Sequence, residues 1–252
     1  LGPLIAVGIW HVENMSIFAI VMIFIAVTTT LFGYRTTFAN TQKEVSPKDE
    51  VLPFNAMTVY VQFFKNKALF CSGMIMILSS IVFGAMSTFI PLYTVREGFA
   101  NAGIFLTIQA ITVVIARFYL RKYVPSDGLW HYRFMMIVLT LLMVASVIVA
   151  FGPHIVSIFV YISAIFIGIT QALVYPTLTT YLSFVLPKIG RNMLLGLFIA
   201  CADLGISLGG VLMGPISDTV GFKWMYILCA LLVTIAMTLS KIRQRQSVSK
   251  AS

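Results

Sequence analysis

Long uninterrupted runs of apolar residues are the feature of this sequence that most restricts its fold. Residues 138–151, 155–175 and 194–213 each contain at most one charged side chain. A helix needs about 20 apolar residues to cross the hydrocarbon core of a bilayer, and these runs lack the strand-like alternation of a membrane barrel. With 60% hydrophobic and 10% charged residues, the chain is too apolar for a soluble helical bundle. We therefore predict an all-α integral membrane protein.

The breaks between apolar runs divide the chain into one partial and seven complete predicted spans. The partial span ends near Ile9, and because the chain starts with Leu1 in apolar sequence, we expect it to be a piece of a longer one. The complete spans are predicted at about 15–36, 68–93, 101–123, 134–151, 154–186, 193–217 and 222–240. Pro176 lies inside the long span 154–186 and is predicted to kink it.

Basic residues fall almost entirely on one side of these spans. Of the 17 Lys and Arg residues, all but Arg96 and Lys223 are on the same predicted side, which is 15 against 2. The fifteen are Arg35, Lys43, Lys48, Lys65, Lys67, Arg117, Arg121, Lys122, Arg133, Lys188, Arg191, Lys241, Arg243, Arg245 and Lys250. The positive-inside rule places that side, with the polar loop 37–66 and the C-terminus, in the cytoplasm of a cell whose plasma membrane the chain crosses. Since the charge is spread over separate loops, a nucleic-acid partner is disfavoured.

The segment before the second complete span combines aromatic residues with Lys65 and Lys67. It follows a polar linker at 41–50. We predict a short helix over 54–67 that lies along the membrane interface, with an irregular extension of the span at 68–93 as the equal alternative.

Two stretches of the chain resemble each other. Gly2-Pro3 is followed by Trp10 and an apolar helix, and Gly214-Pro215 is followed by Trp224 and an apolar helix. Each ends a span with Gly-Pro, turns and re-enters the membrane, as expected of an internal duplication. Two equal halves would give roughly 400 residues and twelve helices, with the partial span as helix five.

Three motifs resemble those of the major facilitator superfamily. Gly2-Pro3 is similar to the end of the fifth-helix motif of proton-coupled exporters, although the usual glycine pair does not follow. The loop after 101–123 keeps Arg117 and Asp127-Gly128 of the superfamily's cytoplasmic signature, with Arg121 where Gly is usual and Pro125 where Asp is usual. The span 193–217 is the best match and is similar to bacterial drug and metabolite efflux proteins. Its matching residues are Gly196, Asp203, Gly205, Gly209, Asp218 and Gly221.

This resemblance implies a fold, a division of the chain and a function. The fold is the C-terminal six-helix bundle of a twelve-helix transporter, preceded by the end of helix five and helix six. The predicted parts are 1–36 from the N-terminal bundle, 37–67 as the cytoplasmic central loop, 68–240 as the C-terminal bundle and 241–252 as a cytoplasmic tail.

The function implied is proton-coupled efflux of a small organic solute, with metallophore exporters as the nearest group. The partners expected are this substrate, the lipid bilayer and the N-terminal half of the same chain. The alternatives are an uptake symporter for a small metabolite, a truncated membrane fragment that does not transport, and, less favoured, an integral-membrane enzyme.

Asp203 is the acidic residue nearest the middle of any predicted span. An intramembrane carboxylate is a functional hypothesis by default because its burial is costly. On a helical wheel Asp203 shares a face with Gly196, Ser207, Gly210 and Gly214, whereas Gly205 and Gly209 lie on the other side and predict a close-packing surface. Asp203 is either a proton or substrate site or a hydrogen-bonded structural residue between helices.

Other polar side chains within the spans extend the candidate substrate and proton pathway. Gln171 lies one turn from Tyr175, and Gln109 lies in the span 101–123; both amides suit a partly polar substrate, with hydrogen bonds between helices as the alternative. Arg117 either binds an anionic group, forms a gating ion pair or anchors its helix at the interface. A stripe on the span 68–93 lines either a cavity or a packing surface. It consists of Ser72, Met76, Ser79, Phe83 and Ser87.

Residues for cofactor or metal chemistry are not apparent. Cys71, Cys201 and Cys229 sit singly in apolar sequence, and His11, His131 and His154 have no ligand spacing. The chain has no phosphate-binding loop. We therefore predict no enzyme activity and no cofactor, with the proton gradient as the source of energy.

Overall fold

The structure is a computed structural model that describes residues 20, 23–31, 33, 61, 63–154, 156–188 and 190–248. The chain divides into two compact units, Leu1–Leu52 and Pro53–Ser252. In the first, residues 23–31 are helical, within the predicted span 15–36, and Thr28, Thr29 and Thr30 each donate a hydrogen bond to a carbonyl one turn earlier. Gly2-Pro3, the partial span near Ile9 and most of the loop 37–66 lie outside the described residues.

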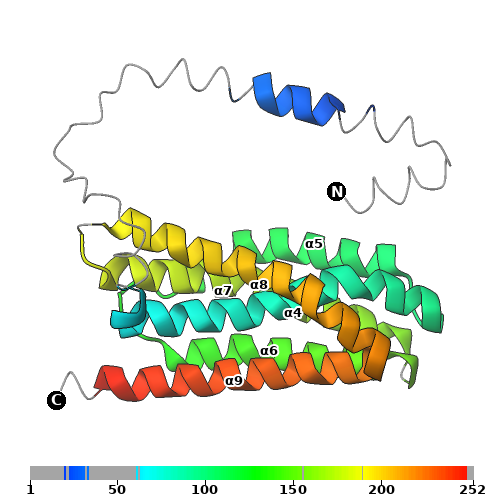
Figure 1. Cartoon of the computed structure of the whole chain (residues 1–252). Coiled ribbons are helices and arrows are strands. Elements are labelled where there is room, and N and C mark those ends of the chain that lie inside the picture. Colours follow the sequence, from blue (N-terminus) through cyan, green and yellow to red (C-terminus); the bar gives the residue numbers. More distant parts are fainter. Residues whose placement is uncertain are drawn as a thin grey trace. The chain divides into compact units, whose positions relative to one another are not determined.

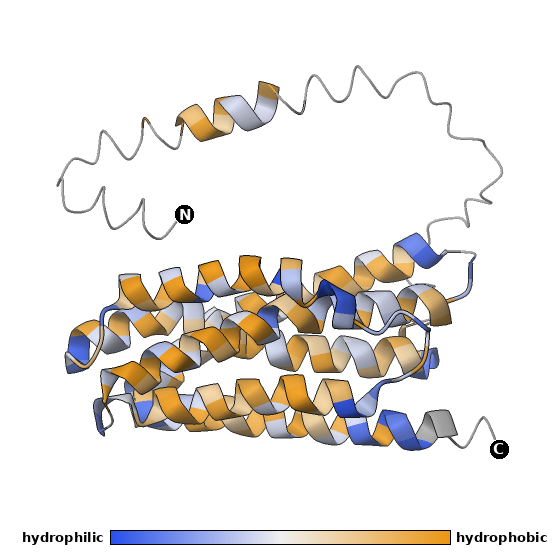
Figure 2. Cartoon of the chain, turned by 180° about the vertical axis from the view of Figure 1, so that it is seen from behind, coloured by the Kyte–Doolittle hydropathy of each residue, from blue (hydrophilic) through white to orange (hydrophobic). Residues whose placement is uncertain are grey.

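Six long helices make up the described part of the second unit (Figure 1). They are α4 (Lys67–Glu97), α5 (Ala102–Tyr119), α6 (Tyr132–Ala150), α7 (Ser157–Val185), α8 (Arg191–Val220) and α9 (Phe222–Val248). All six are long and apolar enough to cross a membrane. Figure 2 shows apolar residues along the middle of the bundle and polar residues toward its ends. The six predicted spans after residue 67 are therefore confirmed.

The ends of the helices differ from the predicted ends where loop residues form other hydrogen bonds. α5 ends at Tyr119, and Arg121–Tyr123 form a separate 3₁₀ turn. The span predicted to start at residue 154 begins at Ser157, after a 3₁₀ turn at Gly152–His154. α9 continues to Val248, and α7 continues through Pro176. The apolar runs therefore predicted the positions of the helices correctly, but they predicted the ends of the helices less accurately.

α4 is the central helix of this unit. It packs against α8, α9 and α7, and most of its length is buried. A Cβ added at Gly205 of α8 would lie 2.5 Å from Ser80 Cβ and 2.7 Å from the Ile77 carbonyl oxygen, so only glycine permits this approach of α8 to α4. Gly209 meets the α4 backbone in the same way. The close-packing surface predicted at Gly205 and Gly209 is confirmed, and its partner is α4.

The start of α4 is fixed by a side-chain cap. The Asn66 side chain accepts hydrogen bonds from the backbone N–H groups of Ala68 and Leu69 at 3.0 and 3.3 Å. Residues 63–65 are helical, and the helix is interrupted at Asn66. The cap therefore separates α4 from the residues before it, as expected of a distinct short helix rather than an extension of α4.

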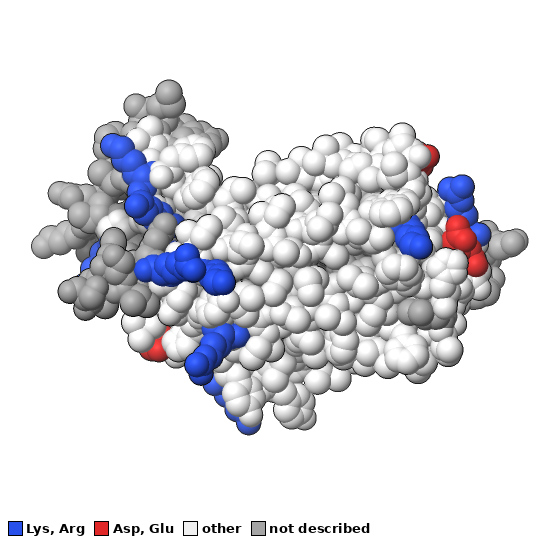
Figure 3. Space-filling model, turned by 90° about the horizontal axis from the view of Figure 1, so that it is seen from below, with Lys and Arg blue, Asp and Glu red and all other residues white. Residues whose placement is uncertain are grey.

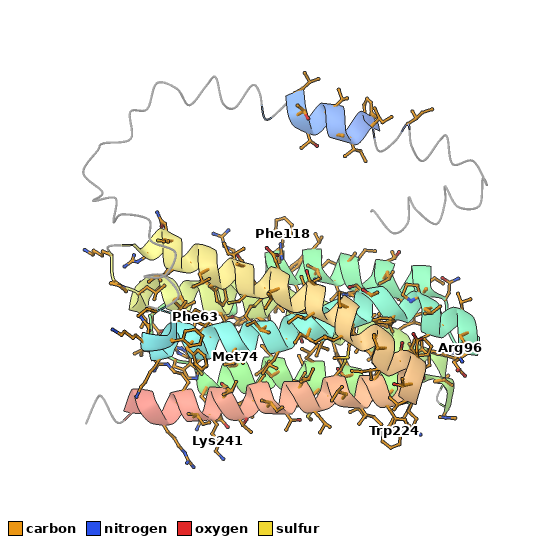
Figure 4. All side chains as sticks on the ribbon, viewed as in Figure 1. Phe63, Met74, Arg96, Phe118, Trp224 and Lys241 are labelled. Atoms are coloured by element: carbon orange, nitrogen blue, oxygen red, sulfur yellow. The ribbon has the colours of Figure 1, made fainter. Side chains whose placement is uncertain are left out.

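Charged side chains gather at the two ends of the bundle, and a face without them lies between (Figure 3). Because the helices alternate in direction, the start of α4 and the end of α9 share one end, whereas Arg96 and Lys223 lie at the other (Figure 4). At that second end, Tyr93 stacks against Phe222 with ring centroids 5.0 Å apart, and Lys223 lies 4.7 Å above the Phe151 ring. We call the end with Lys67 and Arg243 the basic end, because eleven of the thirteen described Lys and Arg residues lie there.

Candidate transport pathway

Asp203 lies twelve residues after the start of α8, about 18 Å along the helix. Its side chain is exposed, as is Ser207 one turn later. The Ser207 hydroxyl donates a hydrogen bond to the Asp203 backbone carbonyl at 2.9 Å and not to the Asp203 carboxylate. Within the described residues, the carboxylate has no hydrogen bond or ion pair. The face of α8 that carries Asp203 is thus uncovered there, and a Cβ at Gly196 would meet nothing within 4 Å.

Gln109 and Gln171 bind each other. The Gln109 amide nitrogen donates to the Gln171 side-chain oxygen at 3.1 Å and joins α5 to α7. Gln109 is buried, and its own amide oxygen has no hydrogen-bond partner among the described residues. Gly168 lets the helices approach here, because a Cβ would lie 2.8 Å from the Gln109 carbonyl oxygen. The structure therefore contains the hydrogen bond between helices that was the alternative to substrate binding.

Arg117 and Tyr175 line one cavity of about 810 Å³ between the end of α5 and α7. Arg121 and Lys122 of the 3₁₀ turn also line it, whereas no Asp or Glu does. Tyr175 also packs on the buried Phe198 of α8, with ring centroids 6.1 Å apart. Three cations and a phenol thus surround a space large enough for a small organic molecule.

This cavity lies well inside the basic end of the bundle. Tyr175 is ten residues, or about 15 Å, before the end of α7 at Val185. α5 has 18 residues and α7 has 29, and the shorter α5 stops where the cavity begins. Arg117, in the last turn of α5, lines this cavity together with Tyr175 of α7.

Gln171 and Asp203 lie at similar depths. Gln171 is fourteen residues from both ends of α7, about 21 Å from each. Asp203 is about 18 Å from the basic end of α8. Gln109, Gln171 and Asp203 thus lie near the middle of their helices, whereas Arg117 lies in the last turn of α5. The structure groups the selected side chains as two pairs and a separate Asp203.

Most of the stripe on α4 packs inside the described bundle. Ser72, Met76, Ser79 and Phe83 are buried inside the unit, and of the five stripe residues only Ser87 is exposed. The cavity reading of this stripe is therefore wrong for those four residues. They fill the space between α4 and the helices around it.

Two groups of residues near the basic end were not predicted. Arg121 and Lys122 line the cavity of Arg117, and Arg243 is buried with Tyr181. Both Arg243 Nε and Nη2 donate to the Tyr181 hydroxyl, and Trp130 packs on the same tyrosine with ring centroids 5.0 Å apart. Nothing in the local sequence distinguishes Arg243 from Lys241 or Arg245 beside it. Among the described residues, no cluster of three His, Cys, Asp or Glu side chains could hold a metal ion.

Comparison with known proteins identifies the family. The model of the Major Facilitator Superfamily matches residues 1–210 and 126–252. The chain is 69% identical over 244 residues to the staphylopine export protein of Staphylococcus aureus. It is 25% identical over 181 residues to uncharacterized MFS-type transporters of Burkholderia mallei and Burkholderia pseudomallei.

These matches cover part of the relatives. The first alignment includes 97% of this chain and 62% of the staphylococcal protein, and the Burkholderia alignments include 69% of this chain and 42% of those proteins. No solved structure matches the chain.

Proposed function

The chain belongs to the Major Facilitator Superfamily, and on that basis we propose that it is part of a secondary transporter that exports staphylopine or a closely related metallophore. The observation that supports the proposed substrate is the 69% identity to the staphylopine export protein over nearly the whole chain.

The cationic cavity supports an anionic or metal-chelating substrate. Arg117, Arg121 and Lys122 line it without an acidic residue among the lining side chains. Cations of one sign that line the same space attract a negatively charged group to it. Arg117 and Tyr175 line the same cavity, so we assign both to the substrate path.

The hydrogen-bonded pair Gln109 and Gln171 extends this proposed path along α5 and α7. Both lie between α5 and α7, and α7 continues from Gln171 through Tyr175, whose side chain lines the cavity. An amide pair can exchange its mutual hydrogen bond for one to a substrate, because each amide both donates and accepts. We propose that the pair closes α5 on α7 when the substrate is absent.

Asp203 is the proposed proton carrier. It lies near the middle of α8, on the side that the described helices leave uncovered. We propose that the N-terminal bundle covers this side and that rocking of the two bundles exposes Asp203 alternately to the two faces of the membrane. Release of a proton on the inner side and uptake on the outer side would drive substrate outward as antiport.

The same proposal fixes the parts of the chain. Residues 1–36 belong to the N-terminal bundle, 37–66 form the central loop and α4 to α9, residues 67–248, form the C-terminal bundle. The bundle thus extends past the predicted end at residue 240, and the tail is shorter than the predicted 241–252. The basic asymmetry places the loop and the tail in the cytoplasm of a cell with this transporter in its plasma membrane.

Export from cells tests the proposal. The full gene product that contains this chain, expressed in a bacterium that makes staphylopine but lacks its exporter, is expected to restore staphylopine in the medium, and an uncoupler is expected to abolish this. Arg117→Gln is expected to raise the apparent KM for staphylopine by roughly tenfold or more, the range for a lost hydrogen bond to a charged group. Arg117→Lys keeps the charge and is expected to lose less.

Two results would contradict the proposal. Accumulation of staphylopine inside cells that express the gene product would indicate uptake instead of export. An unchanged KM in Arg117→Gln, at wild-type expression, would remove Arg117 from the substrate path.

A further inference from the structure

Arg243 is a buried cation without an anionic partner in the described part of the chain. Its side chain is 8% exposed. Nε and Nη2 donate to the Tyr181 hydroxyl at 3.0 and 2.5 Å, and the guanidinium carbon lies 5.8 Å from the centroid of the same ring. The ion pair between His131 and Asp127 is the only one among the described residues. A neutral phenol accepts hydrogen bonds but does not neutralise a charge, so the cost of burying Arg243 remains largely uncompensated.

A cavity of about 530 Å³ opens beside Arg243 at the basic end. Two further cations, Lys65 and Lys67, line it, and no acidic side chain does. The remaining lining residues are Asn66, Ala68, Val185, Pro187 and Leu194. Four helices meet at this point: the start of α4, the end of α7, the start of α8 and the end of α9. Three like charges that converge on one space repel one another unless an anion is bound between them.

The surroundings of this cavity suit the phosphate of a lipid. Phe64, next to Lys65, is 69% exposed, and Phe184, next to Val185, is 57% exposed. Phe63 and Phe64 pack edge to face at 5.5 Å, and Phe70 packs on both. Aromatic side chains at the end of a membrane span lie at the level of the lipid headgroups. Cations inside and exposed apolar side chains at the rim match a phosphate that continues into acyl chains.

We propose that this cavity binds the headgroup phosphate of an anionic phospholipid from the leaflet at the basic end. Arg243, held in place by Tyr181, contacts the phosphate from inside the bundle, and Lys65 and Lys67 contact it from the start of α4. Basic pockets between membrane helices on the cytoplasmic side are the recurrent sites for such headgroups. The bound lipid would join α4, α7 and α9 and neutralise Arg243. This site shares no lining residue with the cavity of Arg117, so it stands apart from the proposed export path.

Lipid binding to the full gene product, purified in a neutral detergent, tests this proposal. Phosphatidylglycerol is expected to raise its Tm and to remain bound in native mass spectrometry, with phosphatidylcholine much weaker in both. The double variant Lys65→Gln/Lys67→Gln removes two exposed side chains, so it is expected to fold normally and to bind phosphatidylglycerol roughly tenfold or more weakly. Arg243→Gln is expected to weaken binding further.

Lys241→Gln is the matched control. Lys241 lies half a turn from Arg243 on α9, is exposed, and does not line the cavity (Figure 4). The Lys241→Gln variant loses one positive charge from the same end of the bundle, and the affinity of this variant for phosphatidylglycerol is expected to equal that of the wild type. Equal Tm shifts with phosphatidylcholine, equal protection by inorganic phosphate alone, or undiminished phosphatidylglycerol binding in Lys65→Gln/Lys67→Gln would each overturn the proposal.

Discussion

At the scale of single residues, Asp203 shows how a polar group can be identified before its partner is known. The apolar residues around it make its carboxylate conspicuous in the sequence, and the structure places it on an open face of α8. A charge at that depth costs several kcal/mol without a partner. The helices α4 to α9 supply none among the described residues.

Asp203→Asn is expected to separate proton coupling from structure. Asparagine keeps the size of the side chain and its capacity for hydrogen bonds, but it cannot release a proton. The full gene product with this change is expected to insert at wild-type levels and to lose accumulation of substrate against a gradient, while downhill exchange continues. Substrate flux in proteoliposomes, with and without an imposed pH gradient, measures both.

The control for this change is Asp218→Asn, because Asp218 is an exposed carboxylate in the last turn of the same helix. It is expected to retain coupled transport. Coupled transport by Asp203→Asn at the wild-type rate would assign Asp203 a structural role and move the search for the coupling carboxylate to other helices.

At the scale of elements, the close contact between α4 and α8 can be traced to particular residues in the sequence. Glycines at 205 and 209 recur every fourth residue on one face of α8, and the facing α4 residues Ser80 and Gly84 are also small. In a bilayer, helices associate through such close contacts because lipid tails are as apolar as leucine side chains. The Gly205 face of α8 therefore packs on α4, whereas the Asp203 face is exposed.

Gly205→Ala is expected to destabilise the protein by about 1–3 kcal/mol, the usual range for overpacking. The added methyl group would overlap Ser80 Cβ and the Ile77 carbonyl, and the second of these is backbone that cannot move aside. The Tm of the full gene product in detergent is expected to fall accordingly.

Gly196→Ala is its matched control, since it makes the same change on the same helix where the new Cβ meets nothing within 4 Å among the described residues. Because Gly196 lies on the face proposed to meet the N-terminal bundle, the Tm of this variant is expected to fall less than that of Gly205→Ala. An equal fall in Tm for both variants would mean that loss of glycine, and not contact with α4, causes the effect.

At the scale of the whole molecule, the distribution of charge follows from alternating helix direction. Eleven described Lys and Arg residues lie at one end of the bundle and Arg96 and Lys223 at the other. This asymmetry, which the sequence already contains, is the basis for the predicted orientation.

Labelling of single cysteines in intact cells tests the orientation. Ser46→Cys and Ser252→Cys, at positions outside the described residues, are expected to resist a membrane-impermeant thiol reagent until the cells are opened. Glu97→Cys lies at the opposite end of the bundle and is exposed, so it is expected to react in intact cells. The native cysteines at 71, 201 and 229 are buried and give the unlabelled background. Reaction at 46 or 252 before lysis would reverse the orientation.

The amino-acid sequence was enough to predict where the six described spans lie, which end of the bundle is basic, and which face of α8 carries glycine. These are local properties: about 20 consecutive residues decide whether a segment enters the bilayer, and neighbouring loops decide its direction. The sequence also singled out Asp203, Gln109, Gln171, Tyr175 and Arg117 as polar residues within or at the ends of apolar spans.

Only the tertiary structure decided which of these residues meet. Gln109 binds Gln171 from 62 positions away, Arg117 shares a cavity with Tyr175, and four residues of the α4 stripe turn into the core. Arg243 is buried against Tyr181, also 62 positions away, whereas Lys241 beside it stays exposed. This is because the packing of membrane helices depends on the complementary shapes of their surfaces and on hydrogen bonds between segments that are distant in the sequence. Hydropathy along the chain therefore does not predict which helices pack together.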